Sequence, residues 1–451
     1  MRRRAFLKNL AASGLALNMP LLTNNAHAQA APDKYLIVVQ ADGGWDPTSF
    51  CDPKGLNQAY SDKSALFGGS TNSVAINPTK RIGEIQWTDM PDIADLAAAD
   101  AARIQDQIDS FFTTYGSRMT VVNGIDTTTN NHDVGKRYMW SGHIDVSHPS
   151  LAAFYAGAIA PSLPLAFMSG GGFDYTASVV ARARAKSPAL ITEVAEPNVT
   201  YGGRNILNVS SEMDVYAEVL AAQQKRLARQ LASEELERRR SQIGQLFGVR
   251  SNGADLSAMS PYLADVQANV APDDHWNAGR ADSFKAQAQL VAAAMKANLA
   301  ISANLYMTGF DTHDNHDSGS FPLMGDLCEG VHYLMVLLEY LGIREKVTVV
   351  VGSDFGRTPY YNVVKGKDHW PLTSMLVMQG DNITTEGRVY GATTQDFNSQ
   401  KINAISGLPD ESGLILEASH VNQELRKLMG VANHPLAQLF SLPESGFDIF
   451  G

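Results

Sequence analysis

The sequence predicts an α/β protein with a doubly wound, mostly parallel sheet and helices on both faces. Apolar runs of strand length alternate along the chain with longer segments of helical composition, which is the pattern of consecutive strand–helix units. Two of these runs, Tyr35–Val39 and Val347–Val351, are almost continuously apolar, as expected for strands that are buried on both faces. The chain has 451 residues, 44% hydrophobic and 18% charged, so it can fill one large domain or two smaller ones.

The other elements follow from the same alternation. Ser211–Phe247 predicts one long helix, because it is rich in helix formers, with Ser211 as N-cap and Gly248 just beyond its end. We assign this helix to a mainly helical insertion at about 205–280 within an α/β domain of residues 33–451. The further predicted strands are Met119–Val122, Leu163–Met168, Ile301–Met307 and Ser374–Gln379. The further predicted helices are Ala101–Tyr115, Ala281–Leu299, Leu323–Leu341 and Glu417–Met429, with another beginning at about Asp133. Asp52–Pro78 is rich in turn residues and predicts a loop.

The N-terminus predicts an export signal. A basic start, Arg2–Lys8, precedes a mildly apolar run, Leu10–Leu22, which Gly14 and Pro20 interrupt. Residues 26–28, Ala-His-Ala, then offer a cleavage site between small residues. The apolar run is too short to span a membrane, and no later segment has about eighteen uninterrupted apolar residues, so we expect no stable membrane anchor.

The core of this signal, Arg3–Lys8, resembles the twin-arginine signal, which directs folded proteins to their own translocase. Arg2 stands where that signal usually has Ser or Thr, and a general secretory signal with three arginines is the alternative. The resemblance implies transient contact with the twin-arginine translocase, removal of residues 1–28 and a periplasmic or secreted protein.

Charge and cysteine content restrict the partners. The formal net charge is −11, and removal of the four basic residues of the signal shifts it to about −15. Such a chain lacks the basic field that nucleic acid requires, so we expect no nucleic-acid partner. Cys51 and Cys328 are the only cysteines, too few for a disulfide scaffold or a four-cysteine zinc site. Pairing of these two thiols after export stays open, beside the alternative of two buried free thiols.

Polar residues cluster directly after the predicted strands, where open α/β sheets bind their ligands. The first strand is followed by Asp42-Gly43-Gly44-Trp45-Asp46, in which the glycines permit a tight turn and the two carboxylates can bind a metal ion. The second is followed by Gly124–Asp133, which ends by opening a predicted helix. Its Thr hydroxyls could cap that helix or attack a substrate, and His132 is either functional or an exposed loop residue.

Two later clusters are denser in metal-ligand types. Gly309–Asp317 places Asp311, His313 and His316 within a few residues, on a segment whose Gly, Asp and Asn content predicts a loop. Asp354 follows the strand Val347–Val351, and His369 lies on the next loop. A carboxylate and an imidazole at a strand end can together hold a metal ion.

The order of these motifs resembles the alkaline-phosphatase-like superfamily, which includes sulfatases and metal-dependent phosphoglycerate mutases. More closely, Gly309–His313 (GFDTH), Ser353–Pro359 (SDFGRTP) and Asp368-His369 resemble a twin-arginine-exported bacterial family of unknown function within that superfamily. The resemblance covers the chain from about residue 33 to the C-terminus.

The resemblance implies one or two divalent metal ions. Zinc, manganese, magnesium and calcium are all candidates for their identity. Asp42, or else Asp46, would be the first metal carboxylate, and Asp311 with His313 would hold one ion. Asp354 would bind the second ion, and His369 would be the late histidine ligand. Two ions about 4 Å apart would clamp an ester oxygen during displacement at phosphorus or sulfur.

The sequence departs from the superfamily at two points. Phe355 follows Asp354 where a second ligand is usual, so one ligand is missing or comes from elsewhere, with His316 as the candidate. The position of the nucleophile holds no obvious Ser, Thr or Cys. Thr129 and His132 are the catalytic candidates, and direct attack by water is the alternative.

Two functions from different classes follow. The first is an exported metal-dependent hydrolase of phosphate or sulfate esters, acting on a small-molecule or glycan ester, with Arg357 and Lys367 as basic residues that bind the substrate. The second is a non-catalytic member of the same superfamily that binds a metal, a glycan or an envelope partner. The ligand-type residues favour the first, and the missing nucleophile favours the second.

Overall fold

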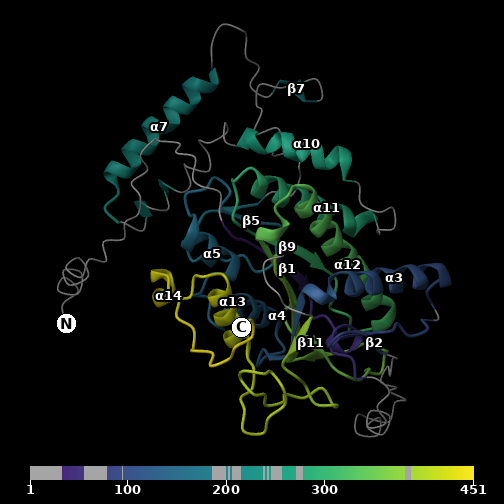
Figure 1. The fold of residues 1–451 in the computed structure, drawn as a ribbon. Helices are drawn as coiled ribbons and strands as arrows, with labels where there is room; N and C mark the ends of the chain where they lie inside the picture. Colours follow the sequence, from purple (N-terminus) through teal and green to yellow (C-terminus); the bar gives the residue numbers. More distant parts are fainter. Residues whose placement is uncertain are drawn as a thin grey trace, which may run out of the picture. The chain divides into compact units, whose positions relative to one another are not determined.

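A central sheet of eight strands organises the protein (Figure 1). The computed structural model describes residues 33–54, 79–93, 95–184, 200–201, 204–205, 215–236, 239–240, 243–244, 256–270, 278–380 and 387–451. The predicted export signal and most of the predicted loop Asp52–Pro78 lie outside these residues. Residues from Pro32 to Gly451 form one compact unit.

The strand order confirms the predicted fold class. In order across the sheet, the strands are β14 (Arg388–Tyr390), β4 (Met119–Asp126), β13 (Leu372–Met378), β10 (Val347–Ser353), β1 (Tyr35–Asp42), β9 (Ser302–Thr308), β5 (Phe167–Ser169) and β6 (Arg182–Ala183). β13 runs antiparallel to both of its neighbours, and the other strand pairs are parallel. Three two-stranded sheets lie outside it: β2 (Thr79–Ile82) with β3 (Ile85–Thr88), β7 (Thr200–Tyr201) with β8 (Arg204–Asn205), and β11 (Gly356–Arg357) with β12 (His369–Trp370).

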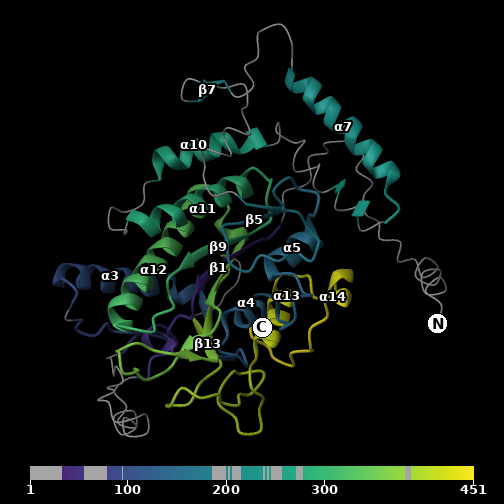
Figure 2. The same ribbon diagram turned by 180° about the vertical axis from the view of Figure 1, so that it is seen from behind.

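Helices cover both faces of the sheet. One set packs together as α3 (Ala98–Tyr115), α10 (Ser260–Asn269), α11 (Ala278–Lys296) and α12 (His316–Tyr340). The other set consists of α4 (His132–Ser141), α5 (Leu151–Ile159) and α13 (Ala418–Leu428). Figure 2 shows the two sets on opposite sides of the strands. The described helices also include α7 (Val215–Ser233) and the short α14 (Pro435–Leu439).

The central strands are buried because helices cover both of their faces. Every residue of Leu36–Val39 and of Val349–Val351 is at most 1% exposed, which explains why these runs contain almost no polar residues. Within the described residues, α12 is the one helix long and apolar enough to cross a membrane, but 78% of its most apolar window is buried inside the protein. We therefore interpret α12 as a core helix.

Several sequence-based boundaries were wrong. The third predicted strand begins at Phe167 rather than Leu163, since Pro164 has no N–H to donate to a neighbouring strand. The long predicted helix Ser211–Phe247 is interrupted: α7 ends at Ser233, where the Glu234 carboxylate accepts a hydrogen bond from the N–H of Leu236 (3.1 Å), and residues 239–240 and 243–244 are helical again. Such a local bond competes with helical pairing.

Two further outcomes concern the predicted loop and the thiols. The segment Gly309–Asp317 is not entirely a loop, because α12 already begins at His316. Cys51 and Cys328 are free and buried, which is the second of the two alternatives given above. Burial raises the pKa of both thiols, so they stay protonated.

Candidate metal centre

The loops of the candidate site meet at one edge of the sheet. β1, β9, β10 and β4 run in the same direction, so their carboxyl ends share this edge. Asp311 lies three residues after β9, Asp354 directly after β10, and His132 opens α4 after β4. β13 is antiparallel and therefore begins at this edge, which brings His369, three residues before it, to the same place.

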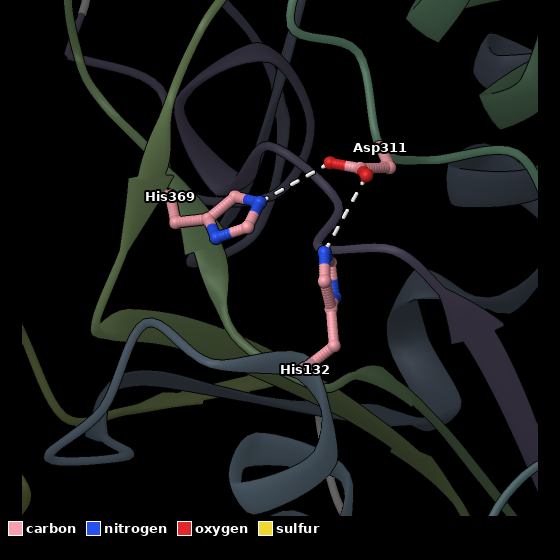
Figure 3. A group of neighbouring side chains, drawn as sticks. All are labelled: His132, Asp311 and His369. Carbon is pink, nitrogen blue, oxygen red and sulfur yellow. Dashed lines mark hydrogen bonds and ion pairs between the residues drawn. The ribbon is translucent and has the colours of Figure 1, made fainter.

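His132, Asp311 and His369 form a group that could hold a metal ion (Figure 3). Each offers one ligand atom, and these atoms all lie within 4.8 Å of one another. Asp311 bridges the two histidines, with its Oδ1 3.2 Å from His369 Nε2 and its Oδ2 3.5 Å from His132 Nε2. Among the described residues, this is the one such group of three.

The two histidines are held by their other ring nitrogens. His132 Nδ1 donates to Asp354 Oδ2 at 2.5 Å, and His369 Nδ1 donates to the backbone oxygen of Asn130 at 2.7 Å. A carboxylate and a carbonyl only accept, so both Nδ1 atoms carry the proton and both Nε2 atoms present a lone pair when the rings are neutral. Histidines that bind metals are oriented in this way.

Asp354 is itself fixed by the turn after β1. Its side chain is 1% exposed, and its Oδ1 accepts from the N–H groups of Gly43 (3.1 Å) and Gly44 (2.6 Å) and from the hydroxyl of Ser353 (2.9 Å). Since Oδ2 binds His132, both oxygens are engaged within the protein. Asp354 therefore orients a histidine, and its carboxylate does not face the His132–Asp311–His369 group.

Glycine is required at this turn. Gly43 and Gly44 have φ values of +118° and +82°, which side chains rarely adopt. A Cβ atom at Gly43 would lie 2.5 Å from the backbone nitrogen of Asp311, and one at Gly44 would lie 2.8 Å from the ring of Phe355. The glycines thus allow the backbone to approach Asp354 closely enough to donate two hydrogen bonds.

A buried arginine holds Asp311 in place. The Arg357 guanidinium lies 2.5 Å from Asp311 Oδ1 and also donates to the backbone oxygens of Gly43, Gly44 and Lys367. Partial burial raises the pKa of Asp311, but Arg357 outweighs it, and the pKa is lowered to about 2. The carboxylate is therefore ionised at neutral pH, although 47% of the side chain is exposed.

The local fields differ at the two histidines. The hydrogen bond to Asp354 raises the pKa of His132, and the charges of Asp354 and Asp311 act in the same direction. Burial lowers the pKa of His369, which keeps its ring neutral. A positive charge is thus favoured beside His132, while a free Nε2 lone pair is favoured at His369.

His313 lies beside the group. Its Nδ1 donates to Asp368 Oδ1 (2.9 Å), and its Nε2 lies 2.9 Å from His369 Nε2 and 3.1 Å from Asp311 Oδ1. Two bare Nε2 atoms at this distance repel each other, so a cation or a shared proton is needed between them. His313 is 47% exposed and can join the other three side chains around an ion.

The donor set fits a divalent metal ion. His132 Nε2 is buried and has no hydrogen-bond partner, although it faces Asp311. Two imidazoles and one carboxylate match the ligand preferences of zinc and of other first-row metals such as iron and manganese. An ion at this position would satisfy the orphaned nitrogen and the acidic field around it.

The structure places the predicted carboxylates of the first loop elsewhere. Asp42 pairs with Lys136 (2.6 Å) and accepts from the Tyr306 hydroxyl (2.6 Å). Asp46 is fully buried, 2.6 Å from Lys367 Nζ and 3.1 Å from His316 Nε2. Neither belongs to the His132–Asp311–His369 group, and both carboxylates are already paired.

The remaining predicted residues are engaged away from the group. His316 is fully buried between Asp46 and the Thr312 hydroxyl, so it does not replace the missing ligand. Arg357 and Lys367 are buried within ion pairs, which leaves neither exposed to bind a substrate. Thr129 accepts from the N–H of Asn131 (3.1 Å), and its hydroxyl makes no described contact with the group.

The roles of some residues in the site were not predicted from the sequence. Asn130 contributes only its backbone oxygen, and no side-chain pattern signals that role. The glycines of the first loop were expected to permit a tight turn, and the structure shows that their N–H groups also bind the carboxylate of Asp354. Asp368 was part of the late Asp-His motif, but its pairing with His313, which is 55 residues away in the sequence, leaves no local pattern.

Known proteins resemble this chain at two levels. Residues 33–405 match the family described as "Protein of unknown function (DUF1501)". No curated protein matches the chain.

The solved structures that match this chain have low sequence identity. The sulfatase PsFucS1 from Pseudoalteromonas sp. is 10% identical, with a TM-score of 0.39, and the match covers 99% of this chain and 77% of that one. The lipoteichoic acid synthase LtaP from Listeria monocytogenes is 8% identical, with a TM-score of 0.35, covering 93% and 76%. The alkaline phosphatase from the Antarctic bacterium TAB5 is 11% identical, with a TM-score of 0.31, covering 80% and 94%.

Proposed function

This chain belongs to the DUF1501 family, and we propose that it is an exported, metal-dependent hydrolase of phosphate or sulfate esters. The observation that carries the proposal is the convergence of His132, Asp311 and His369 at the carboxyl edge of the sheet. The sequence motifs at Gly309–His313 and Ser353–Pro359, which resemble the alkaline-phosphatase-like superfamily, supply Asp311 and the Asp354 that orients His132.

In this proposal, His132, Asp311 and His369 bind the metal ion, with His313 as an additional ligand. A divalent ion bound there would supply a Lewis acid that polarises an ester oxygen and lowers the pKa of water. Asp354 keeps His132 in the tautomer that can bind, and Asn130 does the same for His369. Arg357 keeps Asp311 ionised and fixes its carboxylate beside both rings.

Water is the nucleophile that the geometry supports. The hydrogen bonds and ion pairs described for His132, Asp311 and His369 involve carboxylates, imidazoles, Arg357 and a backbone oxygen, with no hydroxyl or thiol among them. Thr129, the hydroxyl candidate, caps the neighbouring backbone. His132 is oriented as a ligand, so its expected role is binding rather than attack.

The same observation favours a second candidate. A member of this fold without a positioned nucleophile could bind a metal ion or a glycan without hydrolysing an ester. In that case, the orientation of the histidines would increase the affinity for the ion and would have no role in catalysis. The two candidates predict the same metal content and differ in turnover.

The test combines metal analysis with a substrate screen. Purified mature protein, loaded in turn with zinc, manganese, magnesium and calcium, is assayed with aryl phosphate, bis-aryl phosphate and aryl sulfate esters. Hydrolysis that is lost in His369→Ala and retained in His143→Ala, a histidine outside the group, supports the hydrolase. Stoichiometric metal without turnover of any ester supports the binding protein instead.

A further inference from the structure

A lysine lies one helical turn beyond His132 on α4. Lys136 follows His132 by four residues, and residues four apart are neighbours on a helix surface. Its Nζ lies 2.6 Å from Asp42 Oδ1, and 26% of its side chain is exposed. An ammonium group has three donors, so Lys136 keeps donors for a second, solvent-borne anion.

The position of Asp42 ties this lysine to the metal site. Asp42 ends β1 and directly precedes Gly43, whose N–H donates to Asp354. The second oxygen of Asp42 accepts from the Tyr306 hydroxyl at 2.6 Å, which fixes the carboxylate that Lys136 contacts. Lys136 is therefore held beside the turn that orients His132.

Two further cations described at this edge, Arg357 and Lys367, are closed to solvent. Arg357 is 0% exposed, and its guanidinium donates to three backbone oxygens as well as to Asp311. Lys367 is 1% exposed and pairs with Asp46. Neither can reach a ligand from solvent without its buried charge leaving its partner, which is costly.

Charge at this edge limits the ligand further. The carboxylates described in contacts at this edge are Asp42, Asp46, Asp311, Asp354 and Asp368, and the cations are Lys136, Arg357 and Lys367. A divalent ion in the group would balance the excess of two negative charges. The site would then have no net positive charge to attract a doubly charged ligand. The carboxylates would repel each further negative charge on the ligand.

We propose that Lys136 binds the charged head of the substrate and that this head carries a single negative charge, as in a sulfate monoester or a phosphate diester. This inference rests on the proposed function and narrows its substrate class, since a phosphate monoester carries up to two charges at neutral pH. Lys136 acts as a specificity-determining residue that pairs with one anionic oxygen while the ester bond faces the group.

Binding tests the charge rule without turnover. Calorimetry on the metal-loaded mature protein compares benzenesulfonate with phenylphosphonate, two aryl ligands whose tetrahedral heads differ by one charge above the second ionisation of the phosphonate. Benzenesulfonate is expected to bind about tenfold more tightly or better, and Lys136→Gln to weaken it at least about tenfold. Lys136→Arg keeps the charge and should retain most of the affinity, while Arg137→Gln, the adjacent cation on α4, should leave it unchanged.

Two results would overturn the inference. One is tighter binding of phenylphosphonate to the wild-type protein, and the other is unchanged benzenesulfonate affinity in a Lys136→Gln protein that retains its far-ultraviolet circular dichroism and its metal. Kinetics separate this inference from the proposed function. Preferred hydrolysis of the aryl phosphate monoester refutes the charge rule and leaves the hydrolase intact. Benzenesulfonate binding through Lys136 without turnover of any ester supports the charge rule and refutes the hydrolase.

Discussion

Asp354 Oδ2 lies 2.5 Å from His132 Nδ1, and the other oxygen of the same carboxylate accepts three hydrogen bonds from the protein. One buried carboxylate thus links the end of β10, the turn after β1 and the first residue of α4. Because the Nδ1 proton is bound, Nε2 of His132 faces Asp311 as a lone pair. Through this pair, the carboxylate at the end of β10 fixes the tautomer of His132 and leaves its Nε2 able to bind a metal ion.

The first prediction concerns Asp354→Asn. The amide oxygen can still accept from Gly43 and Gly44, but the amide NH₂ then faces His132 Nδ1, which must lose its proton to accept it. The proton moves to Nε2, so metal affinity should fall about 10–100-fold, as for other residues that orient a ligand. Metal titration measures this change. Asp133→Asn, an exposed residue in the first turn of α4, is the control and should have no effect. Equal affinity in Asp354→Asn and wild type would remove the orienting role.

A second prediction concerns Gly43. Gly43→Ala adds a Cβ 2.5 Å from the backbone nitrogen of Asp311 at a φ of +118°. We expect a loss of more than about 2 kcal/mol in the free energy of unfolding, together with weaker metal binding. Chemical denaturation provides the measurement. In Gly430→Ala the added Cβ meets nothing within 4 Å at a φ of +72°, so only the backbone cost of about 1–2 kcal/mol is expected. Similar losses in the two variants would contradict the close approach.

The third prediction concerns acid stability. Burial raises the pKa of Asp46, but Lys367 and His316 outweigh it and hold that pKa well below its usual range. A carboxyl with a lowered folded-state pKa stabilises the fold above its unfolded pKa of about 4, and this contribution is lost as the pH falls below that value. Asp46→Asn leaves Lys367 buried without its charge partner and should cost about 3–5 kcal/mol at neutral pH.

The measurement for Asp46 is urea denaturation over a range of pH. The difference between wild type and Asp46→Asn should be constant above pH of about 5 and should shrink below about 4. A difference that grows on acidification would have the wrong sign for a lowered carboxyl pKa. It would show that the ion pair with Lys367 does not stabilise the ionised form.

The sequence could predict the central strands because burial on both faces leaves a simple signature. Val347–Val351 and Tyr35–Val39 are almost continuously apolar, and each lies in the centre of the sheet. Strand direction has no such signature. β13 reads as an apolar run like its neighbours, yet its antiparallel course is what brings His369 to the edge with Asp311.

The individual roles of the carboxylates were harder to predict. Asp42, Asp46, Asp311 and Asp354 all follow predicted strands, so their positions at one edge could be expected. Which of them faces an ion depends on partners far away in the sequence. Lys367 forms an ion pair with Asp46, and backbone N–H groups of the first loop donate to Asp354. These contacts depend on tertiary packing and leave no local pattern.

The fourth prediction concerns export and rests on the sequence alone. The twin-arginine pathway requires its arginine pair, so Arg3→Lys combined with Arg4→Lys should leave the precursor in the cytoplasm. Fractionation of cells that express the tagged protein measures this. The single change Arg2→Lys, outside the pair, serves as the control. Normal accumulation of the double variant outside the cytoplasm would favour the general secretory route.

The most direct test of the metal centre is the metal content of the purified mature protein, measured by mass spectrometry after loading and dialysis. We predict one divalent ion per chain, bound by His132, Asp311 and His369, with loss of that ion in His369→Ala and in Asp311→Ala. The control His143→Ala, which changes a histidine outside the group, should keep it. A wild-type protein that retains no ion, or a His369→Ala protein that retains it fully, would contradict the metal centre.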